Sequence, residues 1–510
     1  MNRLLLLLLV GLISFSTHSF CQSSRFQTER LDSFITKAMT DWNLMGLAIA
    51  IVKNDSVILA KGYGYRDYKN KLSVNENTIF PIASCSKTFT TALMGMAEKD
   101  GKIQLDKPVH KFFPQFQLYT EQLTKQVTAE DMLSHRTGSA GHDWAWAFNT
   151  NFPENVYLKR IKFQEPFAPL RTQFQYSNFM FFALSVLSGK LYNTTWNDLV
   201  NKKVFQPLEM NNTYSNSASL NINANAALKY EFNDSFEVKP TNQMNDLLGA
   251  GSVNSTAADL AHYLQMWING GVYKNKQVLP ADFVKRSIQS HFLVDEGMND
   301  QYPDEHFSNV GLCWFLSSYR GHYKAHHYGN IDGFSSTLTF YPYDSLGIVV
   351  LTNQNNSALI RLVPDFVADL VLDLPVRDKN SAFLERRKKY QVKTPKPQFV
   401  NVDTISTKPL FSIEKYTGQF VNAGYGELKI ETYKKALVLT YYNLKLLLIP
   451  KGGHRFSTHY WWEEGIFPGG VGDVVFKFNN GVLHSFQIPF EPTVRDIVFR
   501  KQQDTMARMK

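Results

Sequence analysis

The stretch PIASCSKTFT at residues 81–90 decides the expected chemistry, because a serine and a lysine stand three residues apart where a helical pattern begins. If the helix starts near Ser84, Lys87 lies on the same face as the Ser84 hydroxyl. A serine hydroxyl is a weak nucleophile until a base takes its proton. Lysine is such a base only when neutral, and burial and the positive helix N-terminus lower its pKa. The pair predicts a nucleophile with its base, and a Ser84 backbone N–H that faces a developing oxyanion.

Spacing alone does not single out this pair. A serine three residues before a lysine is expected roughly twice by chance in a chain of this length, and a second copy occurs at residues 412–415. Only residues 84–87 open an apolar helix after a pair of predicted strands. We interpret residues 412–415 as a surface segment.

A second candidate segment is Tyr176-Ser177-Asn178. The pattern Tyr-x-Asn occurs six times in the chain, so most copies carry no function, but this one leads directly into the apolar stretch 179–187. A tyrosine and an amide at the mouth of a buried helix can point into a cleft. The alternative interpretation of Tyr176 is a half-buried core residue.

A third segment, His327-Tyr328-Gly329-Asn330, leads into a predicted strand at residues 336–340. A histidine at a strand edge followed by glycine suits close approach of the main chain to a ligand, because glycine has no Cβ atom. The nearby His322 and His326 raise a metal-site alternative, but they match no zinc-ligand spacing. We expect neither a metal nor another cofactor.

Working outward, apolar patterns at 47–52, 57–60, 336–340 and 348–351 predict strands, and those at 23–42 and 358–372 predict helices. Early and late strands on either side of a helical middle indicate an α+β domain whose sheet joins both ends of residues 22–376. The composition, 44% hydrophobic and 19% charged, is that of a globular protein.

The C-terminal part reads differently. Residues 377–407 form a predicted basic linker, in which the stretch 377–397 holds eight Lys and Arg against two Asp and Glu. Short β patterns fill residues 408–510, at 418–420, 428–431, 436–441, 445–449, 474–478, 485–488 and 497–499. They predict a small antiparallel barrel or sandwich. The net charge of +9 lies mostly in these two regions, and no recognisable nucleic-acid-binding fold accompanies it.

Residues 1–21 read as an export signal, with Arg3, an apolar run at 4–13 and a small-x-small site ending at Cys21. A lipoprotein anchor on Cys21 is the less favoured alternative. The run is too short to span a bilayer, and no later stretch is long enough, so we expect an exported protein without a transmembrane span. It would keep Cys85 and Cys313, whose pairing the sequence does not decide.

The three segments occur in one order with long gaps, and with them the chain resembles the serine β-lactamase and penicillin-binding-protein-like superfamily, in its class C-like, D-aminopeptidase and esterase branch. The resemblance spans about residues 24–375. Its marks are the sequences at residues 84–90, 133–138 (Leu-Ser-His-Arg-Thr-Gly), 176–178, 207–210, 249–253 with 258–260, and 327–329. The tail resembles the lipocalin-like β module of some members of this superfamily.

The resemblance implies a β-lactamase/transpeptidase-like domain, an antiparallel sheet flanked by helices plus a helical region, followed by the small barrel. It also implies that Ser84 forms an acyl-enzyme while Lys87 and Tyr176 move the proton. Asn178 would orient Lys87 and the substrate, and the backbone N–H groups of Ser84 and Asn330 would form the oxyanion hole. His327 and Gly329 replace the usual Lys-Thr-Gly, and a histidine is only partly charged near neutral pH.

The sequence thus predicts an exported, periplasmic or secreted serine hydrolase that acts on small peptides, amides or esters, which could derive from the cell wall. One alternative is a β-lactamase or D,D-carboxypeptidase with the same site. Another is an acylatable binding or sensor protein that does not turn over. We expect the tail to influence substrate range or to form a homo-oligomer, because the consecutive aromatics at 460–462 cannot all be buried on one face of a strand.

Overall fold

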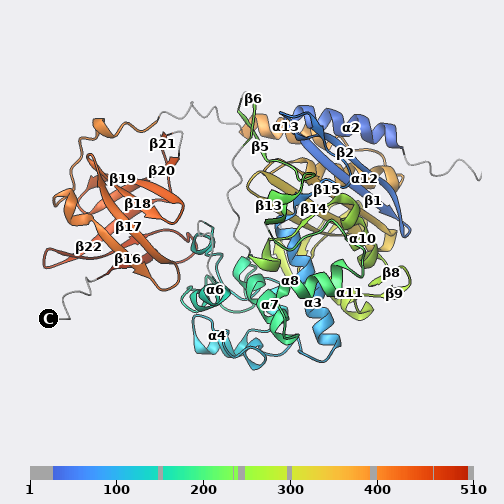
Figure 1. The fold of residues 1–510 in the computed structure, drawn as a ribbon, viewed down its shortest axis with the longest axis horizontal. Helices are drawn as coiled ribbons and strands as arrows, with labels where there is room; N and C mark the ends of the chain where they lie inside the picture. The colour runs from blue at the N-terminus through green and yellow to red at the C-terminus, as the bar shows by residue number, and fades with distance from the viewer. Residues whose placement is uncertain are drawn as a thin grey trace, which may run out of the picture.

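A computed structural model of the protein describes residues 27–147, 153–216, 218–233, 235–238, 247–295, 301–390, 399–462 and 465–502. The predicted export signal and Cys21 lie outside these residues. The chain forms an α+β domain and a β-barrel, which lie side by side in Figure 1. Within the described residues no helix is both long and apolar enough to cross a bilayer.

A nine-stranded antiparallel sheet organises the first domain, in the order β10-β11-β12-β13-β14-β15-β1-β2-β3. Strand β1 pairs with β15 in the register Ala50 to Val349, so the sheet joins both ends of the domain as predicted. Its strands are β1 (Gly46–Lys53), β2 (Ser56–Asp67), β3 (Leu72–Ser73), β10 (Phe292–Asp295), β11 (Ser308–Val310), β12 (Phe315–Tyr319), β13 (His322–Ile331), β14 (Phe334–Tyr341) and β15 (Leu346–Thr352).

Alternation along β1 divides the core into two layers. Leu47, Ile49 and Ile51 pack with α2 and α12 on one face of the sheet. The intervening residues 48, 50 and 52 belong to the larger cluster that contains α3 and α10 on the other face. Both faces of β1 are therefore buried, which is why this strand reads as one continuous apolar run.

The helical region lies on the α3 side of the sheet (Figure 1). The helices are α2 (Thr28–Asp41), α3 (Lys87–Lys99), α4 (Glu121–Gln126), α5 (Ala129–Leu133), α6 (Glu154–Ile161), α7 (Asn178–Leu191), α8 (Trp196–Val200), α9 (Ala218–Ile222), α10 (Ala257–Ile268), α11 (Ala281–Ser287), α12 (Leu359–Val371) and α13 (Lys379–Tyr390). Two-stranded pairings join β4 (Phe80–Pro81) to β7 (Asn254–Ser255), β5 (Tyr230–Asn233) to β6 (Ser235–Val238) and β8 (Val272–Tyr273) to β9 (Lys276–Gln277).

The C-terminal region is a closed eight-stranded antiparallel barrel, with an additional strand, β21. The order β19-β18-β17-β16-β24-β23-β22-β20 closes through pairing of β19 with β20. The strands are β16 (Gly418–Asn422), β17 (Gly426–Tyr433), β18 (Ala436–Tyr441), β19 (Leu444–Gly452), β20 (Arg455–Trp462), β21 (Gly465–Phe467), β22 (Asp473–Asn479), β23 (Val482–Ile488) and β24 (Ile497–Lys501). The predicted antiparallel barrel is confirmed, although β21 and the part of β20 before residue 460 were not among the predicted strands.

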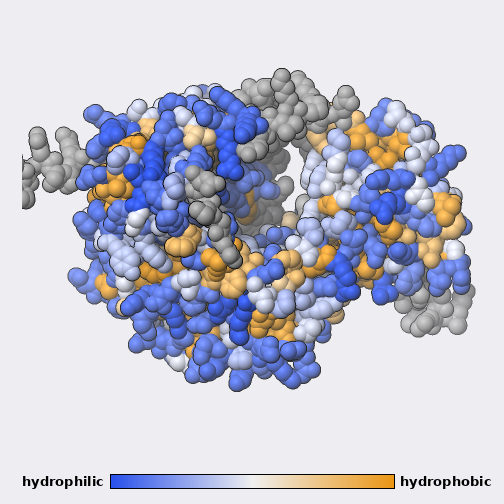
Figure 2. Space-filling model, turned by 180° about the vertical axis from the view of Figure 1, so that it is seen from behind, coloured by the Kyte–Doolittle hydropathy of each residue, from blue (hydrophilic) through white to orange (hydrophobic). Residues whose placement is uncertain are grey.

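Fully buried aromatic rings fill the barrel. Phe486 lies 5.0 Å from Phe420 and 5.3 Å from Phe499 between ring centroids. The consecutive aromatics divide as alternation requires: Trp461 packs on the cluster around Val402, whereas Trp462 is 41% exposed. Seen from behind, most of the surface is hydrophilic, with scattered hydrophobic patches (Figure 2).

Helix α13 occupies the first part of the predicted linker. Its first residue, Lys379, is buried and its Nζ donates to Glu305 and Asp365 of the first domain. Asn380 accepts a 2.8 Å hydrogen bond from the Trp42 indole. Residues 379–380 therefore anchor this helix to the first domain, and the predicted boundaries of the linker stay a prediction.

Candidate active site

The main chain turns sharply just before Ser84. Strand β4 ends at Pro81, and Ala83 has a φ of 48°, in the left-handed region. That conformation costs an alanine about 1 kcal/mol. A short 3₁₀ helix, η1 (Ala83–Ser86), follows, and α3 begins at Lys87. The turn places Ser84 at the entrance of α3, as the sequence predicted.

Hydrogen bonds fix η1 against the sheet. The Cys85 thiol donates to the carbonyl oxygen of His327 at 3.2 Å, and Ser336 Oγ donates to Ile82 O at 2.7 Å. The Ser86 hydroxyl accepts from the Val253 N–H at 3.0 Å. The Ser86 hydroxyl is therefore buried and hydrogen-bonded to the main chain, whereas Ser84, two residues earlier, is partly exposed.

The amino group of Lys87 lies at the centre of the site. Its Nζ is 3.0 Å from Ser84 Oγ, 2.7 Å from Asn178 Oδ1 and 2.6 Å from Ala250 O. A protonated amine has three N–H donors for these oxygens. A neutral amine keeps two donors for Asn178 and Ala250 and turns its lone pair to the Ser84 O–H. The geometry suits both protonation states.

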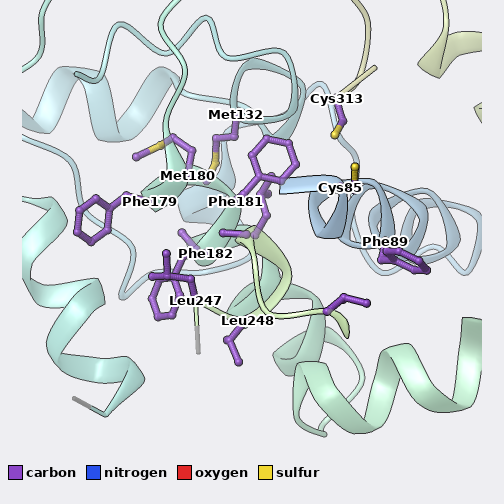
Figure 3. Close-up of a cluster of buried hydrophobic side chains, with 14 of the residues drawn as sticks. Cys85, Phe89, Met132, Phe179, Met180, Phe181, Phe182, Leu247, Leu248 and Cys313 are labelled. Atoms are coloured by element: carbon purple, nitrogen blue, oxygen red, sulfur yellow. The ribbon is translucent and has the colours of Figure 1, made fainter. Parts of the chain in front are cut away.

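Burial makes both states accessible. The Lys87 side chain is fully buried, and this burial lowers its pKa to about 7. The packing around it is apolar: Lys87 Nζ is 5.8 Å from the centroid of Phe181, which Figure 3 shows in a buried cluster with Met132, Met180, Cys85 and Cys313. Both thiols are free, and burial raises the pKa of each to about 12. The predicted pair of Ser84 with a neutralisable lysine is present in this geometry.

Tyr176 lies against the same amine. Lys87 Nζ is 4.8 Å from the centroid of its ring, and the ring packs on His135 at 4.3 Å. Burial raises the pKa of the Tyr176 hydroxyl well above its usual value, while Ser84 acts in the opposite direction. The Tyr176 hydroxyl is buried and makes no hydrogen bond that satisfies normal geometry within the described residues. It is thus a protonated hydroxyl beside the serine.

Asn178, the first residue of α7, bridges the amine to an acidic group. Its Oδ1 accepts from Lys87, and its Nδ2 donates to Asp143 Oδ1 at 3.0 Å. Asp143 was not among the predicted site residues. The only sequence signal for it is its position five residues after the stretch 133–138.

His327 lies in β13 with its ring buried. Its Nδ1 is 2.7 Å from Tyr328 O, and its Nε2 is buried without a partner among the described residues. Burial, with the nearby Lys87, lowers the pKa of His327 to about 3. Burial therefore favours a neutral ring at this site, in contrast to the partly charged histidine expected near neutral pH for a ring in water.

Gly329 and Asn330 follow at the edge of the sheet, beyond the point where pairing of β12 with β13 stops at His326. The Asn330 side chain is exposed, and its Oδ1 accepts from Ser335 Oγ at 2.7 Å. The oxyanion-hole role of its N–H stays a prediction. The two histidines of the metal-site alternative have other neighbours. His322 Nδ1 lies 3.0 Å from Asp344 Oδ1, and the ring centroids of His326 and Tyr328 are 4.6 Å apart.

Residues 133–138 make a hydrogen bond that positions the segment between Tyr176 and Asn178. His135 Nδ1 accepts from the Ser177 N–H at 3.2 Å, which fixes the segment between Tyr176 and Asn178. Arg136 donates to the buried Asp131 at 2.7 Å. The second serine–lysine pair lies elsewhere, in the barrel region: Ser412 directly precedes the short helix η8 (Ile413–Tyr416), and Lys415 in that helix covers the ring of Phe411.

Comparisons with known proteins agree with this fold. The unguisins hydrolase ungD' of Aspergillus campestris is 29% identical over 420 residues, which cover 78% of this chain and 76% of the relative. Protein flp of Staphylococcus aureus is 26% identical over 348 residues, 67% of this chain and 66% of flp.

Solved structures give the same result for the fold. The octameric penicillin-binding protein homologue from Pyrococcus abyssi has a TM-score of 0.61 at 19% identity, covering 93% of this chain and all of that one. A class C beta-lactamase has a TM-score of 0.55 at 20% identity, covering 70% of this chain and 99% of that one. A family model described as beta-lactamase matches residues 31–371. The chain therefore belongs to the beta-lactamase family.

Proposed function

We propose that the protein is an exported serine hydrolase that forms an acyl-enzyme on Ser84 with small peptides, amides or esters. The observation that carries the proposal is the 3.0 Å contact between Ser84 Oγ and Lys87 Nζ. The Lys87 pKa of about 7 leaves much of this amine neutral at physiological pH. A neutral amine within hydrogen-bond distance of a hydroxyl can accept its proton.

In the proposed acylation step, Ser84 Oγ attacks the substrate carbonyl carbon while its proton passes to Lys87 Nζ. The tetrahedral intermediate carries one negative charge on the former carbonyl oxygen, which the N–H groups of Ser84 and Asn330 would stabilise. Collapse breaks the bond to the leaving amine or alcohol, which takes a proton from the site. A water molecule then attacks the acyl-enzyme ester on Ser84, which releases the acid product and free Ser84.

Tyr176 is the proposed proton donor to the leaving group. Its hydroxyl is protonated at neutral pH because burial raises its pKa, and Lys87 can replenish the proton across the site. Asn178 and Ala250 hold the amine in place, since each accepts one of its N–H groups. Their contacts restrict the lone pair of neutral Lys87 to the direction of Ser84.

The substrate class follows from the charge at His327. A lysine there would offer a permanent cation to a substrate carboxylate, whereas buried His327 is neutral, with its pKa lowered to about 3. This favours esters and amides whose reacting end is uncharged over β-lactams or D,D-peptides. The similarity to a protein named unguisins hydrolase supports a hydrolytic activity.

The test is a substrate panel on purified residues 22–510. We expect steady turnover of nitrophenyl esters or D-amino-acid anilides, and slow or no turnover of a chromogenic cephalosporin. Faster hydrolysis of the cephalosporin would identify a β-lactamase instead. A stoichiometric burst without turnover on every substrate would identify an acylatable sensor.

Export is supported by the pattern of residues 1–21, and a homo-oligomer by the exposed Trp462 of the barrel. N-terminal sequencing of the protein from the periplasm or medium should begin at Gln22. A chain retained in the cytoplasm with Met1 intact would contradict export. Light scattering then gives the oligomeric state of the full mature chain.

A further inference from the structure

Asp143 is linked to the proposed base, Lys87, through one intervening residue, Asn178. It belongs to a short 3₁₀ helix, η3 (Asp143–Ala145). A single oxygen, Oδ1, accepts the Asn178 side-chain amide at 3.0 Å and the Trp146 indole N–H at 2.9 Å. Asn178 in turn contacts Lys87, so the series Asp143–Asn178–Lys87–Ser84 is continuous.

The Asp143 carboxylate determines the orientation of the Asn178 side-chain amide. An ionised carboxylate only accepts hydrogen bonds, so the Asn178 NH₂ group must face Asp143. The Asn178 oxygen then faces Lys87, where it accepts an amine N–H. A reversed amide would present two N–H donors to the amine and would no longer hold it.

The turn that carries Asp143 is strained. His142, directly before it, has a φ of 47°, in the left-handed region that non-glycine residues seldom occupy. Such a residue keeps this conformation only where its surroundings enforce it. Here the enforcing contacts come largely from the barrel.

Three contacts hold His142. Its N–H donates to Glu491 Oε2 of the barrel region at 2.7 Å. Its Nε2 faces the Glu165 carbonyl oxygen at 2.8 Å, so Nε2 carries the proton. Its Nδ1 therefore accepts the hydroxyl of Tyr425, also of the barrel region, at 2.8 Å.

The next residue is held as well. The ring of Trp144 stacks on Phe490, with 5.2 Å between centroids and 0° between planes. Phe490 and Glu491 are adjacent in the turn after β23. One barrel turn thus contacts both sequence neighbours of Asp143, His142 and Trp144. Figure 1 shows the barrel next to the region of α6.

We propose that Asp143 is a positioning residue through which the docked barrel holds Asn178 against Lys87. The inference rests on the proposed function, because it takes Lys87 as the base. The barrel then serves the active site by enforcing a strained turn, and its aromatic-filled interior is structural. This gives the tail a role in catalysis that needs no ligand of its own.

The charge of Asp143 affects the pKa of Lys87, which can be measured independently of the hydrogen bond to Asn178. The titratable or charged groups that face Lys87 from the surrounding elements are Cys85 from η1, His135 after α5, Asp143 from η3, Tyr176 before α7, Cys313 before β12 and His327 from β13. Asp143 is the carboxylate among them, and it acts to raise the Lys87 pKa, against the larger effect of burial. Removing its charge should lower that pKa.

The experiment measures the rate of covalent labelling of Ser84 by a fluorophosphonate probe between pH 5 and 9. In Asp143→Asn the indole N–H of Trp146 keeps the new amide oxygen in place, so the hydrogen bonds stay and only the charge is lost. We expect the rise of rate with pH to move to lower pH by about half a unit or more. In Asp143→Ala the plateau rate should also fall about tenfold, because the Asn178 amide loses its acceptor.

The barrel side is tested with Glu491→Ala. This variant should lower the plateau rate severalfold without the pH shift, because it loosens the turn and leaves the Asp143 charge. The matched control is Arg495→Ala, which removes an exposed ion pair with Glu165 across the same interface and should label at the wild-type rate. Circular dichroism and thermal unfolding establish that each variant is folded.

The outcomes separate the two proposals. If wild-type Ser84 is not labelled, the proposed function fails. If wild type is labelled but Asp143→Asn and Asp143→Ala show the wild-type pH profile and plateau, the positioning role is overturned. A Glu491→Ala protein that is folded and labels at the wild-type rate overturns the barrel's part in it.

Discussion

The main chain of Gly329 approaches that of Ile82 so closely that a Cβ atom on Gly329 would lie 2.1 Å from the Ile82 carbonyl oxygen. The same atom would lie 2.4 Å from Ser336 Oγ. Ile82 is two residues before the proposed nucleophile, and Gly329 is in the strand edge that carries His327. The absence of a side chain on Gly329 is therefore what lets β13 and η1 pack together at the site.

Replacing Gly329 with alanine should separate these two segments. Because the nearest obstructing atom, the Ile82 carbonyl oxygen, belongs to the main chain, the backbone must shift, and we expect a loss of about 2 kcal/mol in the free energy of unfolding. A shift of about 1 Å at the nucleophile should lower kcat/KM about 100-fold. Thermal unfolding and ester hydrolysis measure the two effects.

Gly424→Ala is the matched control for stability, because its φ lies outside the left-handed region and the atoms nearest to a Cβ atom there are 3.4 Å away, an ordinary contact. Its melting temperature should equal that of wild type. Equal stability and activity in Gly329→Ala would show that the approach of β13 to η1 is not needed.

The two serines of residues 84–86 should differ in effect. Ser84→Ala should abolish labelling by a fluorophosphonate, because the nucleophilic hydroxyl is gone. Ser86→Ala should still be labelled but lose about 1 to 2 kcal/mol of stability, since the Val253 N–H loses its acceptor. Intact-mass spectrometry checks both. Undiminished labelling of Ser84→Ala would place the nucleophile elsewhere.

The fold could be predicted where local patterns and global packing agree. Strand β1 reads as an apolar run because both faces are buried, and β18 and β19 could be predicted because most of their positions are buried apolar residues. The part of β20 before residue 460 was missed because its inward positions include a polar residue, Thr458. That hydroxyl is buried and donates to Gly472 O at 2.6 Å, a partner 14 residues away that no periodicity reveals.

The site could be predicted in part. The pair Ser84 and Lys87 follows from helical spacing, but Tyr176 and His327 needed the family resemblance. Asp143 could not be found, because its bond to Asn178 joins residues 35 apart and depends on a turn held by the barrel. The charge of His327 could not be found either, since it depends on burial.

Lys87 should govern the pH dependence. The base is its neutral form, so the rate should rise with pH through its pKa of about 7 and level off above it. His327 should not contribute, because its pKa is lowered to about 3 and it stays neutral throughout. In His327→Gln, a neutral polar substitution, the midpoint of the pH–kcat/KM profile should be unchanged. Disappearance of the rise in that variant would show that His327 titrates and that its ring is accessible to water.

The C-terminal barrel should affect the site through the surfaces it covers. A chain ending at Tyr390 keeps α13 and its buried Lys379 bonded to Glu305 and Asp365, but loses the barrel partners of His142 and Trp144. We expect it to fold with a lower melting temperature and to label Ser84 more slowly than the full mature chain. Light scattering of both gives the oligomeric state.

A chain ending at Val376 is the comparison that separates the barrel from α13. It also loses Arg377 and Lys379, the cations that pair with half-buried Glu305, and leaves buried Asp365 with Lys324, so its stability should fall further. The expected order of stability is therefore full chain, then the chain to Tyr390, then the chain to Val376. If the chain to Tyr390 matches the full protein in labelling rate, substrate range and oligomeric state, the barrel has no bearing on the site.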